Sequence, residues 1–185
     1  MAETTWQIDP AHSTIEFAVK HMMFTTVRGR FKDVKGTIHA DESKPDGSSV
    51  EVEINAASID TGAADRDAHL RSADFLDVEQ HPTLTFRSKR VEGAMNKAGD
   101  RFKVVGDLTI RGTTIEVTLD AEYTGQGVDP WGGTRAGVTA KTEIDRRQWG
   151  LQWNQALEAG GILVGNTVKI ELDVQAVKQA AVNAA

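Results

Sequence analysis

The chain has 185 residues, of which 39% are hydrophobic and 26% charged, and its formal net charge is −6. This composition is too apolar for a disordered chain and too polar throughout for a transmembrane segment. The absence of cysteine excludes disulfide scaffolds, thiolate metal sites and cysteine nucleophiles, and an acidic chain without a basic cluster is a poor partner for nucleic acid.

Apolar residues recur at every second position along most of the chain, which is typical of half-buried β-strands. In residues 13–21, Ile15, Phe17 and Val19 alternate with more polar positions and form one apolar face. The same alternation predicts strands over 30–40, 50–55, 84–87, 102–110, 115–120, 134–144 and 168–174, with turn-rich segments between them. The pattern indicates an all-β fold of about eight antiparallel strands.

Two segments depart from this alternation. Residues 62–77 are rich in Ala, Asp and Arg, so we predict a short helical insertion there. Residues 178–185 are Ala-rich and show neither turn nor strand signals, which predicts a flexible tail. The length fits one domain, which we place at residues 1–177.

Eight alternating strands form either a sandwich or a closed barrel, and a small barrel either fills with side chains or holds one ligand. The predicted strand 134–144 favours an open interior, because one face carries the small residues Ala136, Val138, Ala140 and Thr142. Bulky residues opposite could still fill that space. Alternation alone does not decide between an open and a filled interior.

A few polar or aromatic residues have both a structural and a binding interpretation. His21 follows Val19 on an inward face, where it is either a buried structural group or part of a ligand site. In the helical insertion, the neighbours Arg66 and Asp67 either brace the segment or contact an anionic head group. Trp153 belongs to the core or to the rim of a barrel. The five His show no metal-binding spacing.

Several sequence blocks resemble the YceI-like family of polyisoprenoid-binding proteins, and the resemblance extends over nearly the whole chain. The most specific blocks are Asp9-Pro10-x-His12-Ser13-x-Ile15-x-Phe17, Arg66-Asp67-x-His69-Leu70-Arg71-Ser72, Gly106-x-Leu108-Thr109-Ile110-Arg111-Gly112 and Arg147-x-Trp149-Gly150-Leu151. The resemblance implies a lipocalin-like, eight-stranded antiparallel β-barrel around a long apolar cavity. The expected ligand is a linear isoprenoid or similar lipid, such as an isoprenoid quinone. The resemblance also favours a homodimer.

Many members of this family are periplasmic and are exported behind a signal peptide. The N-terminal residues 1–10 show no basic region followed by an apolar stretch, so we expect a cytoplasmic location.

Alternation and the resemblance together select candidate ligand-binding residues. The predicted cavity lining consists of Ile15, Phe17, Val19, Val52, Ile54, Phe86, Leu108, Val138, Ala140 and Val168, and the predicted mouth of His21, Arg66 and Trp153. We expect no catalytic residue, no metal and no cofactor other than the bound lipid.

Three functions fit these observations, and the leading one is non-enzymatic transport or storage of a long-chain lipid. A barrel enzyme acting on a lipidic substrate would need titratable groups that converge inside the cavity. Only His21 and His69 are available, and alternation gives them no inward carboxylate. The third possibility is a stress or interaction protein whose barrel is filled by its own side chains.

Overall fold

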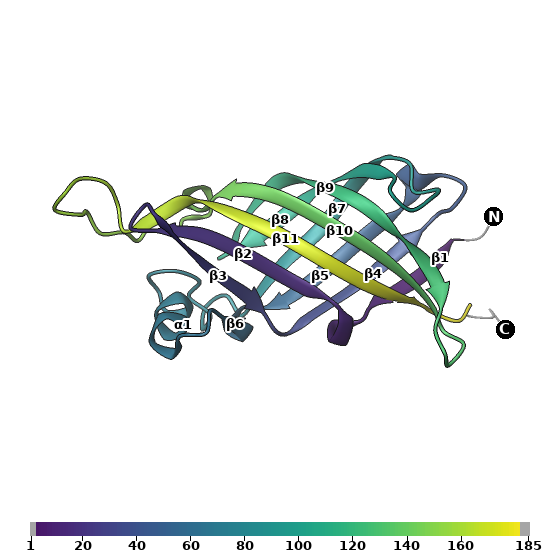
Figure 1. The fold of residues 1–185 in the computed structure, drawn as a ribbon, viewed down its shortest axis with the longest axis horizontal. Helices are drawn as coiled ribbons and strands as arrows, with labels where there is room; N and C mark the ends of the chain where they lie inside the picture. The colour runs from purple at the N-terminus through teal and green to yellow at the C-terminus, as the bar shows by residue number, and fades with distance from the viewer. Residues whose placement is uncertain (1–2, 182–185) are drawn as a thin grey trace.

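The computed structural model describes residues 3–181, most of which lie in antiparallel β-strands (Figure 1). The strands are β1 (Thr4–Ile8), β2 (Thr14–His21), β3 (Thr25–Phe31), β4 (Val34–Ala40), β5 (Ser49–Asn55), β6 (Ile59–Asp60), β7 (Thr83–Gly93), β8 (Arg101–Ile110), β9 (Thr113–Val128), β10 (Thr134–Asp145) and β11 (Val164–Lys178). The helical elements are α1 (Ala64–Arg71) and the short 3-10 turns η1 (Pro10–His12), η2 (Pro45–Gly47), η3 (Ala56–Ser58) and η4 (Arg146–Trp149).

Eight of the strands form a closed ring. Their order is β1, β4, β5, β7, β8, β9, β10 and β11, and the pairing of β1 with β11 closes the barrel. Every pairing is antiparallel, from the β4–β5 hairpin to the long β10–β11 ladder. The predicted eight-stranded antiparallel barrel with a short helical insertion is confirmed, and α1 lies within the predicted range 62–77.

The three remaining strands, β2, β3 and β6, extend the wall at one end. Residues 164–173 of β11 pair with β2, and the last residues of β11 pair with β1. β2 therefore continues the line of β1 after η1, β3 precedes β4, and β6 follows β5 after η3. Figure 1 shows α1 and β6 at this extended end and β1 with the end of β11 at the opposite end.

The prediction of one unbroken strand over residues 30–40 is wrong, because the chain bends between β3 and β4. The backbone N–H of Lys32 donates to the carbonyl of Ser58 at 3.2 Å, and that of Asp33 donates to Ser58 Oγ at 3.1 Å. These two N–H groups bond to Ser58 and not to a neighbouring strand. The chain therefore turns here from one partner strand to the next. β1 also lay outside the predicted strands.

The predicted flexible tail overlaps the end of β11. Lys178 pairs with Trp6, and the backbone N–H of Gln179 donates to the carbonyl of Thr5 at 2.8 Å. Residues 182–185 lie outside the described residues, so the flexibility of that part stays a prediction.

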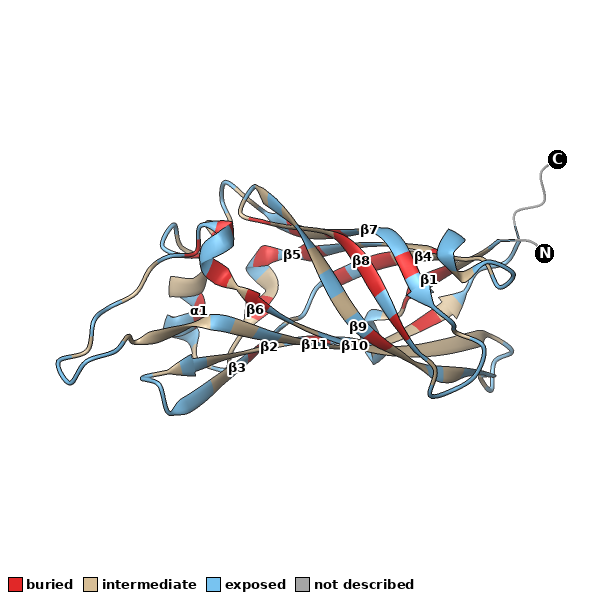
Figure 2. Ribbon diagram, turned by 90° about the horizontal axis from the view of Figure 1, so that it is seen from above, coloured by how far each residue is buried: buried red, intermediate tan, exposed pale blue. Residues whose placement is uncertain are grey.

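The barrel wall turns its apolar face inward, and Figure 2 shows buried segments along β8, whereas in β5 only Ile54 is fully buried. Trp149 is the most deeply buried large side chain, and its Nε1 donates to the carbonyl of Leu108 at 3.0 Å. Trp149 is therefore a core residue.

Arginine side chains attach the helical insertion to the barrel. Arg71 donates to the carbonyls of Ala57 and Ile59 at 2.9 and 3.1 Å, and Arg111 donates to the carbonyl of Phe75 at 2.9 Å. These bonds hold α1 and the segment after it at the extended end of the barrel.

Candidate functional site: an apolar barrel cavity

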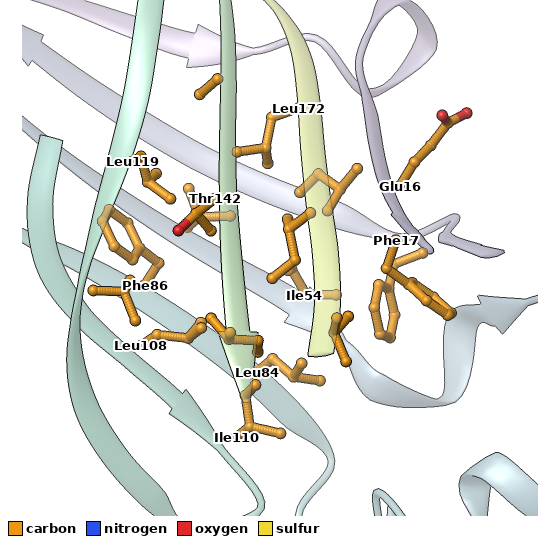
Figure 3. Close-up of a pocket in the computed structure, with 18 of the residues that line it drawn as sticks. Glu16, Phe17, Ile54, Leu84, Phe86, Leu108, Ile110, Leu119, Thr142 and Leu172 are labelled. Carbon is orange, nitrogen blue, oxygen red and sulfur yellow. The ribbon is translucent and has the colours of Figure 1, made fainter. Parts of the chain in front are cut away.

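The barrel encloses a cavity of about 630 Å³ whose lining is dominated by apolar side chains. Every strand from β1 to β11 contributes at least one residue, because the inward face of each strand repeats at a period of two. In Figure 3, Ile54, Phe86, Leu108 and Leu172 reach the cavity from four different strands. The volume lies within the range of about 300 to 1,000 Å³ that is usual for small-molecule pockets.

The small face of β10 borders open space. Val138, Ala140 and Thr142 all line the cavity, together with bulkier residues from neighbouring strands. The bulky residues opposite therefore do not fill the barrel, which was the alternative that the sequence left open.

The structure brings all thirteen predicted site residues to this one cavity. They are Ile15, Phe17, Val19, His21, Val52, Ile54, Arg66, Phe86, Leu108, Val138, Ala140, Trp153 and Val168. Their contact with a ligand stays a prediction.

Polar side chains that border the cavity differ between its two ends. Near the β4–β5 connection the polar lining residues are Ser48 and Ser49, which carry no charge. Near α1 the lining includes Arg66, His69 and Arg146. The cavity therefore has one neutral end and one end with charged and aromatic groups.

Aromatic rings form a cluster at the α1 end. The ring of His69 lies 4.5 Å from that of Trp153 and 5.0 Å from that of Phe75, both edge-on, and Phe75 lies 5.5 Å from Trp153. His69 Nε2 lies 2.8 Å from a carboxylate oxygen of Asp74. Alternation had predicted no inward carboxylate partner for His69. Asp74 was not predicted as a partner because it follows the end of α1, where neither helical nor strand periodicity applies.

Arg66 and Asp67 were predicted either to brace the helical segment or to contact a head group, and the structure places the two side chains differently. Asp67 is buried and accepts hydrogen bonds from the backbone N–H and the hydroxyl of Thr61. It therefore braces the start of α1. Arg66 also donates to Thr61, from Nε to the hydroxyl at 2.7 Å and from Nη2 to the carbonyl at 2.9 Å, while its side chain borders the cavity.

Arg146 is a cavity-lining residue that the sequence reasoning missed. Its side chain is buried and donates to the backbone carbonyls of Leu151, Trp153, Val164 and Gly165, at distances from 2.6 to 3.2 Å. Burial lowers the pKa of its guanidinium. Extending the alternation of β10 two residues past Ile144 would have placed Arg146 on the inward face.

Within residues 3–181, no set of three or more acidic or His side chains is grouped as metal ligands. No helix in that range is both long enough and apolar enough to cross a bilayer.

Comparison with known proteins identifies similar chains. A family model described as the YceI-like domain matches residues 6–176. Protein YceI of Escherichia coli O157:H7 is 43% identical over 141 residues, which covers 76% of this chain and 72% of that protein.

Two solved structures share the fold at low sequence identity. Burkholderia cenocepacia BcnA has a TM-score of 0.77 and 22% identity, and the match covers 91% of this chain and 98% of that one. A polyisoprenoid binding domain from Saccharophagus degradans, implicated in plant cell wall breakdown, has a TM-score of 0.72 and 14% identity, with coverage of 94% and 98%.

Proposed function

The chain belongs to the family of YceI-like domains, and on this premise we propose that it binds a polyisoprenoid or similar long-chain lipid, for example an isoprenoid quinone, inside the barrel. In this proposal the protein carries or stores the lipid and releases it chemically unchanged. The observation that carries the proposal is the open cavity of about 630 Å³, to which every strand contributes lining residues. The name of the S. degradans domain agrees with this class of ligand.

The chemistry of the lining suits a hydrocarbon chain. A prenyl chain has no polar group along its length, so its affinity must come from apolar surface removed from water, worth about 25 cal/mol per Å². Leu84, Phe86, Leu108 and Ile170 are among the residues that offer such surface in the middle of the cavity. Side chains able to transfer protons gather at the α1 end of the cavity. The middle of the cavity therefore favours binding of the hydrocarbon chain over a reaction along it.

Native mass spectrometry tests the proposal directly. The protein is purified without detergent, its intact mass is measured, and any bound molecule is extracted into organic solvent and identified. We expect a stoichiometric adduct with the mass of a long-chain lipid, or uptake of an added prenol by the delipidated protein. An apo mass that persists after addition of prenols, quinones and fatty acids would refute the proposal.

A pair of variants links the adduct to the cavity. Ala140 lines the cavity, whereas its neighbour Lys141 is exposed on the outer face of the same strand. We expect Ala140→Phe to fill part of the cavity and to lower the bound lipid at least tenfold, with an unchanged circular dichroism spectrum. Lys141→Phe should bind as the parent does, so equal binding by both variants would place the lipid elsewhere.

A further inference from the structure

From the distribution of charge around the cavity, we propose that the bound lipid carries an anionic head group, a carboxylate or a phosphate, and that this group lies at the α1 end between Arg146 and Arg66. This inference rests on the proposed lipid-binding function and names the class of lipid. Its first support is the burial of a cation: Arg146 is only 3% exposed and borders the cavity.

The hydrogen bonds of Arg146 leave part of its guanidinium available. A guanidinium has five N–H donors, and the bonds to the carbonyls of Leu151, Trp153, Val164 and Gly165 use four of them. Within residues 3–181, no acceptor is assigned to the fifth donor, which is on Nη2. The carbonyls orient the side chain, but they bring no formal negative charge.

The neighbouring carboxylate attracts this cation through space but makes no hydrogen bond to it. Asp145 accepts from Arg147 instead, through contacts of 2.6 Å from Nη2 and of 3.0 and 3.2 Å from Nε. Arg146 therefore remains a buried cation without an acidic hydrogen-bond partner. A charge in this position is costly unless an opposite charge approaches it.

A second arginine borders the same end of the cavity. The Arg146 guanidinium lies 5.9 Å from the centre of the Phe75 ring, and Phe75 is linked through Trp153 to His69 on α1. Arg66 precedes His69 by three residues, so the two share one face of the helix. Arg66 on α1 and Arg146 on η4 thus border the same end of the cavity, although Arg66 is exposed and bonds to Thr61.

The balance of charge at the lining is positive, although the whole chain is acidic. Lys20, Arg66 and Arg146 border the cavity as cations, against Glu16 and Asp65 as acids. Glu16 points away from the apolar side chains in Figure 3. A guanidinium offers paired N–H donors that match the oxygens of a carboxylate or a phosphate. The apolar middle of the cavity would then hold the hydrocarbon chain of such a lipid.

The test compares ligands that share a chain and differ in the head group. Palmitic acid is measured against hexadecanol, and farnesyl phosphate against farnesol, by titration of the delipidated full-length protein. We expect at least one acid to bind tenfold or more tightly than its alcohol. A preference only for palmitic acid indicates a free fatty acid, and one only for farnesyl phosphate indicates a prenyl phosphate.

Variants locate the head group. Arg146 also holds the backbone, so the test uses Arg66→Met, with Arg101→Met as the control because Arg101 is exposed at the far end of β8. Arg66→Met should remove most of the preference for the acid, and Arg101→Met should keep it.

The possible failures are distinct. Equal binding of acid and alcohol overturns the anionic head group but leaves the lipid-binding function intact. A preference that survives Arg66→Met overturns the site between the two arginines. Binding of none of the four ligands counts against the proposed function itself.

Discussion

At the scale of single residues, Arg146 couples the chain after η4 to β11. Its four carbonyl acceptors lie on the segment 151–153 and at the start of β11. Arg146→Met would remove a donor from all four carbonyls, of which only that of Val164 keeps another side-chain donor, Asn154 Nδ2. One unsatisfied buried group costs about 1 to 3 kcal/mol. We expect the free energy of unfolding in urea to fall by about 3 kcal/mol or more.

The adjacent Arg147 supplies the control for that experiment. It is exposed and its bonds go to the carboxylate of Asp145, an arrangement worth at most about 1 kcal/mol at a surface. Similar losses for Arg146→Met and Arg147→Met would show that the carbonyl contacts of Arg146 contribute little to stability.

Asp9 makes stability depend on pH in the acid range. Arg135 donates to its carboxylate at 2.6 Å and His12 lies 2.8 Å from it, and these bonds lower the pKa of Asp9 from 3.8 to about 2. Between these values the unfolded chain binds more protons than the folded chain, so this contribution is present above pH 4 and is lost as the pH falls towards 2.

The variant Asp9→Asn isolates this contribution from other carboxylates. Asp145 has a pKa lowered to about 2 as well, through Arg147, and it titrates in both proteins. We expect the stability difference between parent and Asp9→Asn, followed by thermal unfolding, to shrink as the pH falls from 4 to 2. A difference that stays constant over this range would show that the ionised Asp9 does not stabilise the fold.

At the scale of elements, the β2–β3 hairpin contains a strained turn. Met22 and Met23 both have positive φ, 50° and 70°, as in a type I′ turn, a geometry that favours Asn and Gly. Placing an ordinary residue in the left-handed region costs about 1 kcal/mol. We expect Met22→Asn to raise the free energy of unfolding by about 0.5 to 1 kcal/mol.

Phe24, the next residue, is the matched control for the hairpin. It is exposed and lies outside the left-handed region, so Phe24→Asn relieves no backbone strain. Chemical denaturation of the three proteins should rank Met22→Asn above the parent and Phe24→Asn level with it. No gain for Met22→Asn would mean that the turn is not under strain.

The elements also show what the sequence could predict. Alternation identifies the inward residues of a strand, such as Phe17 in β2 and Ala140 in β10, because burial on one face imposes a period of two. The bend after Phe31 depends on Ser58, a residue distant in sequence, so no local pattern reveals it. The contacts of Arg146 reach as far as the carbonyl of Gly165, so they too became visible only in the structure. The pairing of His69 with Asp74 is close in sequence, but Asp74 lies past the end of α1, where no periodicity predicts the direction of a side chain.

At the scale of the whole molecule, the cavity runs between a neutral end and a charged end, and this asymmetry constrains how a chain molecule can lie inside. The end near Ser48 offers no charged group, whereas the α1 end offers Arg66 and Arg146. A lipid with its head at the α1 end extends its hydrocarbon towards the β4–β5 connection. Its chain length then determines how far the apolar lining is covered.

The affinity for lipids should therefore rise with chain length until the apolar lining is covered, and then level off. Each additional buried CH2 contributes about 0.8 kcal/mol, so geraniol, farnesol and geranylgeraniol should bind with rising affinity in competition with a fluorescent probe. Ala140→Phe shortens the available space and should move the plateau to a shorter prenol, whereas Lys141→Phe should not. An affinity independent of chain length would contradict binding along the cavity, because a surface site gains nothing from carbon atoms that remain in water.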